Sequence, residues 1–299
     1  MQKAKTIVAT AWQITRGNKN LFKFGFVAQF FGIIFSFFYL TYQIAAFRHS
    51  HLFSAEKENL WKKILTEVLP FAQTHEKFFL IFLISAIVFL VARLFFPTAC
   101  EGAIVFLVGQ KLENKEMKNG LSRAFFLFLP LFEIAILRGS LATSTFFSEW
   151  SFLIRNTSNE TADFFLPILI FFAAVGVLLL FFLSFAVQFV ILEKNNFTAA
   201  LHNSIKLVAK FPKITLQLFL IFVVIELRVF LNIILFLFLP FFVLTTAGFF
   251  ATLFLQSFGF LIAIFLAAVL FCFAAFLTGI LEVFSQAIFT TAFAQFREE

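Results

Sequence analysis

The stretch FFLPILIFFAAVGVLLLFFLSFAVQFVIL, residues 164–192, contains no charged side chain and no regular alternation of apolar and polar residues. A bilayer core is about 30 Å thick, and roughly 20 apolar residues in an α-helix cross it. A strand of a membrane barrel would instead alternate over about 10 residues. Because only helices and closed barrels satisfy their backbone hydrogen bonds in lipid, the stretch predicts a membrane-spanning helix.

The whole chain has the composition of a membrane protein. Its 299 residues are 62% hydrophobic and 13% charged, whereas soluble domains have about 25% charged residues. The charges fall in clusters between apolar runs, so we predict one integral membrane domain over 1–299. The net charge of +7 is typical of the Lys and Arg excess in cytoplasmic loops and does not indicate a nucleic-acid partner.

The apolar runs predict an all-α, polytopic helical bundle with about six transmembrane helices. The predicted spans are 22–47, 78–110, 125–147, 164–191, 214–239 and one within 259–293. No charged residue lies between Arg228 and Glu282, which is too long a segment for one span. Residues 241–257 therefore form either a re-entrant or interfacial segment or a seventh span.

Basic residues predict the orientation, because cytoplasmic loops collect Lys and Arg. The basic segments are the N-terminus, 111–124 and 193–213, and we expect all three on the cytoplasmic side of the inner membrane. The segments 48–77 and 148–163 are mixed or acidic and are expected outside.

Two polar segments repeat each other. LENKEMKNGLSRA (112–124) and LEKNNFTAALHNS (192–204) follow the same order of residue types, with small residues at Gly120 and Ala200 and again at Ala124 and Ser204. We interpret both as amphipathic elbow helices at the cytoplasmic surface, inside two repeat units at about 78–147 and 164–239. Residues 9–26 resemble a third elbow whose partner span could be the C-terminal helix.

The elbows also predict partners. Their basic residues would face anionic lipid head groups and could dock a cytoplasmic partner subunit. These residues are Lys115, Lys118, Arg123, Lys194, Lys206 and Lys210.

Three segments carry a resemblance to a known family. They are LFFPTACEGAIVFLVGQKLENKEMKNGLSRAFF (94–126), QFVILEKNNFTAALHNSIKLVAKFPKITLQLFLI (188–221) and QAIFTTAFAQF (286–296). In pattern and composition the chain resembles the membrane domain found ahead of some bacterial glycerophosphoryl diester phosphodiesterases, which also occurs alone in uncharacterised prokaryotic six-span proteins. The resemblance implies a six-span architecture. It does not imply the enzymatic activity, because the chain has no counterpart of the catalytic domain.

Ionisable residues inside spans are costly in lipid and are the best functional lead in a membrane protein. Those away from the ends of the predicted spans are Arg93, Glu101, Glu133, Arg138, Glu226, Arg228 and Glu282. We expect Arg93, Arg138, Arg228, Glu226 and Glu133 to form a candidate ligand site, because three arginines against two glutamates leave net positive charge for a phosphate or carboxylate. Buried pairs that fix helix register, or a proton relay through Glu133 and Glu226, are the alternatives.

No sequence pattern predicts an enzyme, a cofactor or a metal site. The chain has no phosphate-binding Gly-rich loop, no HExxH and no nucleophile elbow. The function we expect is therefore a non-enzymatic, transporter-like module that handles a lipid or a small anion. The alternative is a membrane-embedded scaffold that docks a partner through its basic elbows.

Overall fold

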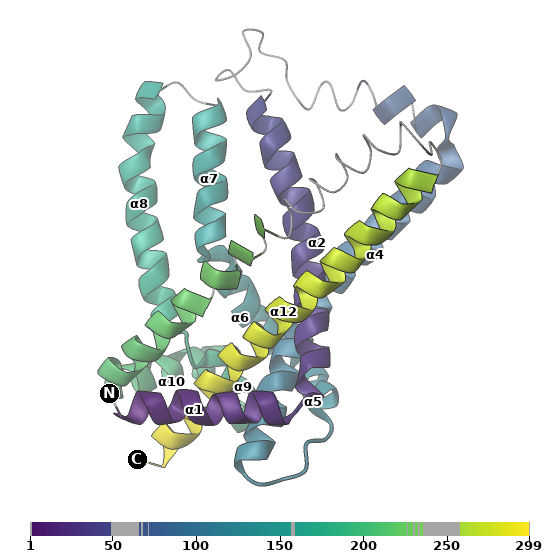
Figure 1. The fold of residues 1–299 in the computed structure, drawn as a ribbon. Helices are drawn as coiled ribbons and strands as arrows, with labels where there is room; N and C mark the ends of the chain where they lie inside the picture. The colour runs from purple at the N-terminus through teal and green to yellow at the C-terminus, as the bar shows by residue number, and fades with distance from the viewer. Residues whose placement is uncertain are drawn as a thin grey trace. The chain divides into compact units, whose positions relative to one another are not determined.

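The computed structural model describes residues 2–48, 66, 68–70, 72–156, 159–225, 227–229, 231–232, 234–235 and 258–298. Throughout these ranges the regular structure is helical (Figure 1). The helices are α1 (Gln2–Gly17), α2 (Leu21–Arg48), α4 (Glu76–Leu112), α5 (Gly120–Phe126), α6 (Phe128–Ser140), α7 (Thr143–Asn156), α8 (Asn159–Phe182), α9 (Ala186–Glu193), α10 (Phe197–Lys210) and α12 (Phe258–Arg297).

Four helical stretches are long and apolar enough to cross a membrane: Leu21–Phe47, Glu76–Leu112, Asp163–Glu193 and Ala268–Arg297. Two bent helix pairs raise the number to six if each pair counts as one span. They are Gly120–Phe126 with Phe128–Ser140, bent by 80°, and Phe197–Lys210 with Pro212–Val229, bent by 108°. The predicted all-α class is confirmed for the described residues, and four to six stretches of helix are candidate membrane spans.

Helix α4 has the exposed apolar surface that is expected of a candidate membrane span. Its N-terminal half exposes large apolar side chains on all sides, with Phe78, Phe82 and Val88 each more than 60% exposed. Its C-terminal half is buried from Thr98 to Gly109 with few exceptions. A helix that is hydrophobic all round is typical of a membrane span.

The predicted spans 22–47 and 78–110 agree with α2 and α4 within two residues, and α12 contains the predicted last span. The predicted span 125–147 is not one continuous helix, because the chain bends between α5 and α6 and breaks again at Leu141 and Ala142. That this segment crosses the membrane once stays a prediction. The predicted loop 148–163 is also largely helical, divided between α7 and α8. Residues 241–257 lie outside the described part of the chain.

The first predicted elbow helix is shorter than expected. Residues 113–119 are not helical, and α5 begins only at Gly120. The reason is local, since Asn114 and Asn119 have φ angles of 56° and 60°, a left-handed conformation that asparagine adopts more readily than most residues. The second elbow is a continuous helix, α10.

The chain divides into two compact units. Unit 1 comprises Met1–Ile34, Phe96–Ala135 and Phe181–Glu299, and unit 2 comprises Phe35–Phe95 and Ile136–Leu180. The prediction of one domain over 1–299 stays a prediction, and each unit is described by itself below.

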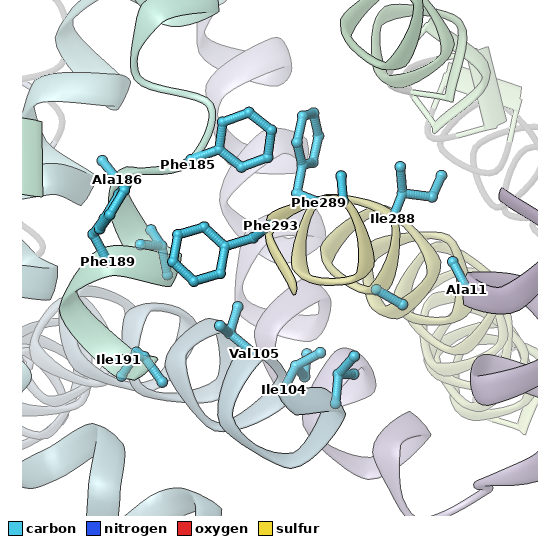
Figure 2. Close-up of a cluster of buried hydrophobic side chains, with 14 of the residues drawn as sticks. Ala11, Ile104, Val105, Phe185, Ala186, Phe189, Ile191, Ile288, Phe289 and Phe293 are labelled. Carbon is cyan, nitrogen blue, oxygen red and sulfur yellow. The ribbon is translucent and has the colours of Figure 1, made fainter. Parts of the chain in front are cut away.

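Aromatic packing forms the centre of unit 1. Phe185 makes ring contacts with Phe289, Phe293 and Phe296 of α12, at centroid distances of 5.7–6.5 Å, and Phe189 contacts Phe293 at 4.8 Å. Figure 2 shows the rings of Phe185, Phe189, Phe289 and Phe293 between α9 and α12, next to Ile104 and Val105 of α4. The same cluster includes the apolar face of α1, which lies along α12.

Candidate functional site

A polar bridge joins three helices inside unit 1. The amide nitrogen of Gln286 on α12 donates to Glu101 Oε1 of α4 and to Glu282 Oε1, at 3.0 Å in each case. Gln29 of α2 donates to the other Glu282 oxygen, at 3.3 Å. Two carboxylates and two amides from helices far apart in sequence thus meet in one place. We call Glu101, Glu282, Gln286 and Gln29 the polar bridge.

The local sequence positions these side chains. Glu282 and Gln286 are four residues apart, so they lie on one face of α12. One turn away, α2 and α12 cross at Gly25 and Gly279, where a Cβ atom on Gly25 would lie only 2.2 Å from the Gly279 carbonyl oxygen. Because neither glycine has a side chain, the two helices approach closely enough for Gln29 to reach Glu282.

The geometry of the bridge defines what it can bind. Glu101 Oε1 and Glu282 Oε1 are at most about 6 Å apart, because each lies 3.0 Å from the amide nitrogen of Gln286. That NH₂ group has two hydrogens and can donate one to each carboxylate. Gln286 is only 8% exposed. Carboxylates brought together inside a membrane protein are typical of proton and ion pathways.

Sequence reasoning identified Glu101 and Glu282 as ionisable residues in spans but did not predict their contact. It also missed both glutamines, because uncharged amides are not conspicuous in an apolar run. The one available signal was the four-residue spacing of Glu282 and Gln286.

The residues of the predicted ligand site are divided between the two units. Arg93 and Arg138 belong to unit 2. The Arg93 guanidinium lies over the ring of Phe35, 3.5 Å from its centroid, in a cation–π contact. Arg138 is half-buried in the last turn of α6, directly before the break at Leu141.

Glu133 and Arg228 belong to unit 1 and are exposed. Glu226 lies outside the described residues. The predicted cluster of three arginines and two glutamates therefore stays a prediction, and so do its alternatives, the buried pairs and the relay through Glu133 and Glu226.

A further arginine, which no sequence pattern singled out, is buried in unit 2. Arg155 of α7 is 9% exposed, with Tyr42 and Phe47 of α2 at 5.8 and 5.3 Å from their ring centroids. On the preceding turn, the Ser151 hydroxyl donates to Gln43 at 2.9 Å. These contacts hold α7 against the second half of α2.

The basic residues of the two predicted elbows have different surroundings. Lys115 and Lys118 form exposed ion pairs with Glu113 and Glu116, at 2.5 and 2.7 Å. Arg123 donates to the carbonyl oxygen of Ile191 at 3.2 Å. By contrast, Lys194, Lys206 and Lys210 are exposed, and no ion pair is present at any of them within the residues described.

No known protein family, curated protein or solved structure matches the chain. Among the described residues, no group of three or more His, Cys, Asp or Glu side chains is close enough together to hold a metal ion.

Proposed function

We propose that this protein is a non-enzymatic, multi-pass inner-membrane protein that handles a lipid or a small anion in the manner of a transporter. The observation that carries the proposal is the polar bridge of unit 1. Ionisable and polar side chains inside membrane helices cost free energy and are usually kept for function. An apolar core would hold three helices together at least as well, because buried charged groups often contribute nothing to stability.

In this proposal, arginines bind the anion and glutamates bind a proton or a small cation. Arg93, Arg138 and Arg228 are suited to a phosphate or carboxylate, because guanidinium groups bind such oxygens in pairs. Glu101 and Glu282 are suited to a proton or a small cation. A bundle that binds an anion together with a positive ion moves little net charge through lipid.

The proposed architecture is an internal repeat, and the backbone supports it. Asn114 and Lys194, which are 80 residues apart, are both left-handed, with φ angles of 56° and 61°. Each follows the end of an apolar helix, α4 or α9, and precedes an amphipathic one. A shared chain reversal at equivalent positions is expected of two copies of one unit.

Side-chain packing supports the same repeat. In the first copy, a Cβ atom added to Gly102 would lie 3.2 Å from that of Ala124. In the second copy, the residues 80 positions later are also in contact, because the Ser204 hydroxyl donates to the Phe182 carbonyl at 2.7 Å. In the proposed third copy, α12 followed in space by α1 and α2, the rings of Trp12 on α1 and Phe284 on α12 are in contact at a centroid distance of 5.3 Å.

A membrane-embedded scaffold is the second candidate. The exposed, unpaired lysines of α10 favour it, because a basic surface can dock an acidic partner subunit. The proposed orientation, with the N-terminus in the cytoplasm, rests on the excess of Lys and Arg in 1–23, where no acidic residue occurs. The proposed family resemblance concerns architecture only.

Native mass spectrometry of the detergent-purified protein separates the two candidates. We expect the wild type to carry a stoichiometric anionic adduct, and the Arg138→Leu and Arg228→Leu variants to lose it while keeping the wild-type melting temperature. Lys115→Gln is the charge-matched control and should keep the adduct. A bare wild-type protein, with arginine variants that no longer fold, would contradict ligand handling and support the scaffold.

A further inference from the structure

Helix α10 has one buried face and one exposed, basic face. Ala200, Ser204 and Val208 recur every four residues and are buried against unit 1. His202 and Lys206 are exposed on the opposite face, and so is Lys210. These three residues also recur every four positions, so their side chains form one row along the helix. We call them the basic stripe.

Among the residues that the structure describes, no carboxylate pairs with the lysines of this stripe. The sequence contains no Asp or Glu from Lys194 to Ile225, and within the described residues neither Lys206 nor Lys210 takes part in an ion pair. The first polar segment differs, because Lys115 and Lys118 each have a carboxylate partner. The two segments are therefore unequal as anion-binding surfaces.

The bend after α10 indicates how this helix would lie relative to the membrane surface. The chain turns by 108° between Phe197–Lys210 and Pro212–Val229. If the apolar helix Pro212–Val229 crosses the membrane, α10 lies close to parallel with the surface. Ile205, which is 45% exposed, lies beside the stripe. Exposed apolar and basic side chains next to each other are typical of a helix at the level of the lipid head groups.

The rest of unit 1 fixes α10 in place. The Ser204 hydroxyl donates to the Phe182 carbonyl at 2.7 Å and accepts from the Phe185 N–H at 3.2 Å. The stripe is thus presented on a helix that is already ordered, which lowers the entropy cost of binding a ligand.

We propose that the basic stripe, together with the exposed Lys213, binds the head groups of anionic phospholipids. The first polar segment, residues 112–124, does not bind them. Lysine binds phosphate as a compact positive charge, and several basic residues near an anionic surface act together. The inference rests on the proposed membrane placement but is independent of any ligand held within the bundle.

Thermal unfolding of the full-length protein in mixed micelles tests this inference. The probe is phosphatidylglycerol, compared with phosphatidylcholine, because a lipid that binds only the folded state raises the melting temperature. We expect phosphatidylglycerol to stabilise the wild type. In the Lys206→Gln/Lys210→Gln variant its apparent affinity should fall about tenfold or more, since each basic residue near the surface contributes several-fold.

Two further variants make the result specific. Lys115→Gln/Lys118→Gln removes the same charge from the first segment and should respond to phosphatidylglycerol as the wild type does. Lys206→Arg/Lys210→Arg should also keep the wild-type response. The melting temperature in phosphatidylcholine shows that each variant folds.

Three outcomes would overturn the inference. One is an equal loss in both glutamine variants, and another is equal stabilisation by the two lipids. The third is stripe-dependent binding of polyglutamate without a lipid preference, which would assign the surface to an acidic protein partner. None of these outcomes changes the adduct experiment with Arg138→Leu, so the two proposals fail separately.

Discussion

At the scale of single residues, Gln286 is the centre of the polar bridge. Its amide nitrogen donates to carboxylates on α4 and α12 at 3.0 Å, and the side chain is almost fully buried. A buried acceptor that loses its donor costs more than the hydrogen bond itself contributed, because the desolvation penalty remains.

We therefore expect Gln286→Leu to destabilise the protein by about 1–3 kcal/mol, measured by thermal unfolding in detergent micelles. Glu101→Gln/Glu282→Gln keeps the shapes of the side chains and removes both charges, so its stability should stay within about 1 kcal/mol of the wild type. If this double variant unfolds more readily than Gln286→Leu, the carboxylates are structural and the functional interpretation of the bridge is wrong.

Gly279 leads to a second prediction at this scale. A Cβ atom there would lie 2.6 Å from both the Gly25 carbonyl carbon and the Phe26 nitrogen, and backbone atoms cannot move aside as a flexible side chain can. Gly279→Ala should therefore separate α2 from α12 and cost about 1–3 kcal/mol. Gly17→Ala is the control, since no atom lies within 4 Å of its added Cβ. Equal stability of the two variants would show that the crossing is looser than described.

At the scale of elements, the break between α8 and α9 is held by a side chain from α10. The Ser204 hydroxyl bonds the Phe182 carbonyl and the Phe185 N–H, two backbone groups that the interrupted helix leaves without their regular partners. A break in a membrane helix is tolerated where another element satisfies the freed groups.

Ser204→Ala should consequently destabilise unit 1 by about 1–3 kcal/mol, because one buried N–H loses its acceptor. Hydrogen exchange of the Phe185 amide would locate the effect at the break. Ser122→Ala, at an exposed position on α5, is the matched control and should change neither measurement. Unchanged protection at Phe185 would mean that Ser204 does not hold the break.

The sequence predicted the long uninterrupted helices well, because runs such as 22–47 are apolar almost throughout and contain no proline or charge cluster that would interrupt them. It did not predict the break at Leu141 and Ala142, where no proline marks the interruption. It also assigned a helix to 113–119, where Asn114 and Asn119 instead adopt left-handed conformations. Local backbone preferences of two asparagines decided that segment, and hydrophobic pattern alone does not report them.

At the scale of the whole molecule, the site was the least predictable part. Glu101 and Gln286 are 185 positions apart, and only the packing of α4 against α12 brings them together. A sequence pattern identifies costly residues such as Glu101 and Glu282 one by one. It carries no information on which helices are neighbours, so it could not reveal that these two carboxylates share one amide.

The central claim is that the polar bridge is a functional site. A proton or a small cation can use the bridge only if water reaches it, so cysteine accessibility tests the claim most directly. In a Cys100→Ala/Cys272→Ala background, the Glu282→Cys variant would be treated with a charged, membrane-impermeant maleimide in open membrane fragments. Lys206→Cys is the positive control. Phe276→Cys, on the outward face of α12, is the negative control. The account predicts that Glu282→Cys is labelled in the folded protein while Phe276→Cys is not. Labelling of Glu282→Cys only after unfolding would mean a dry, structural bridge and would contradict the proposed function.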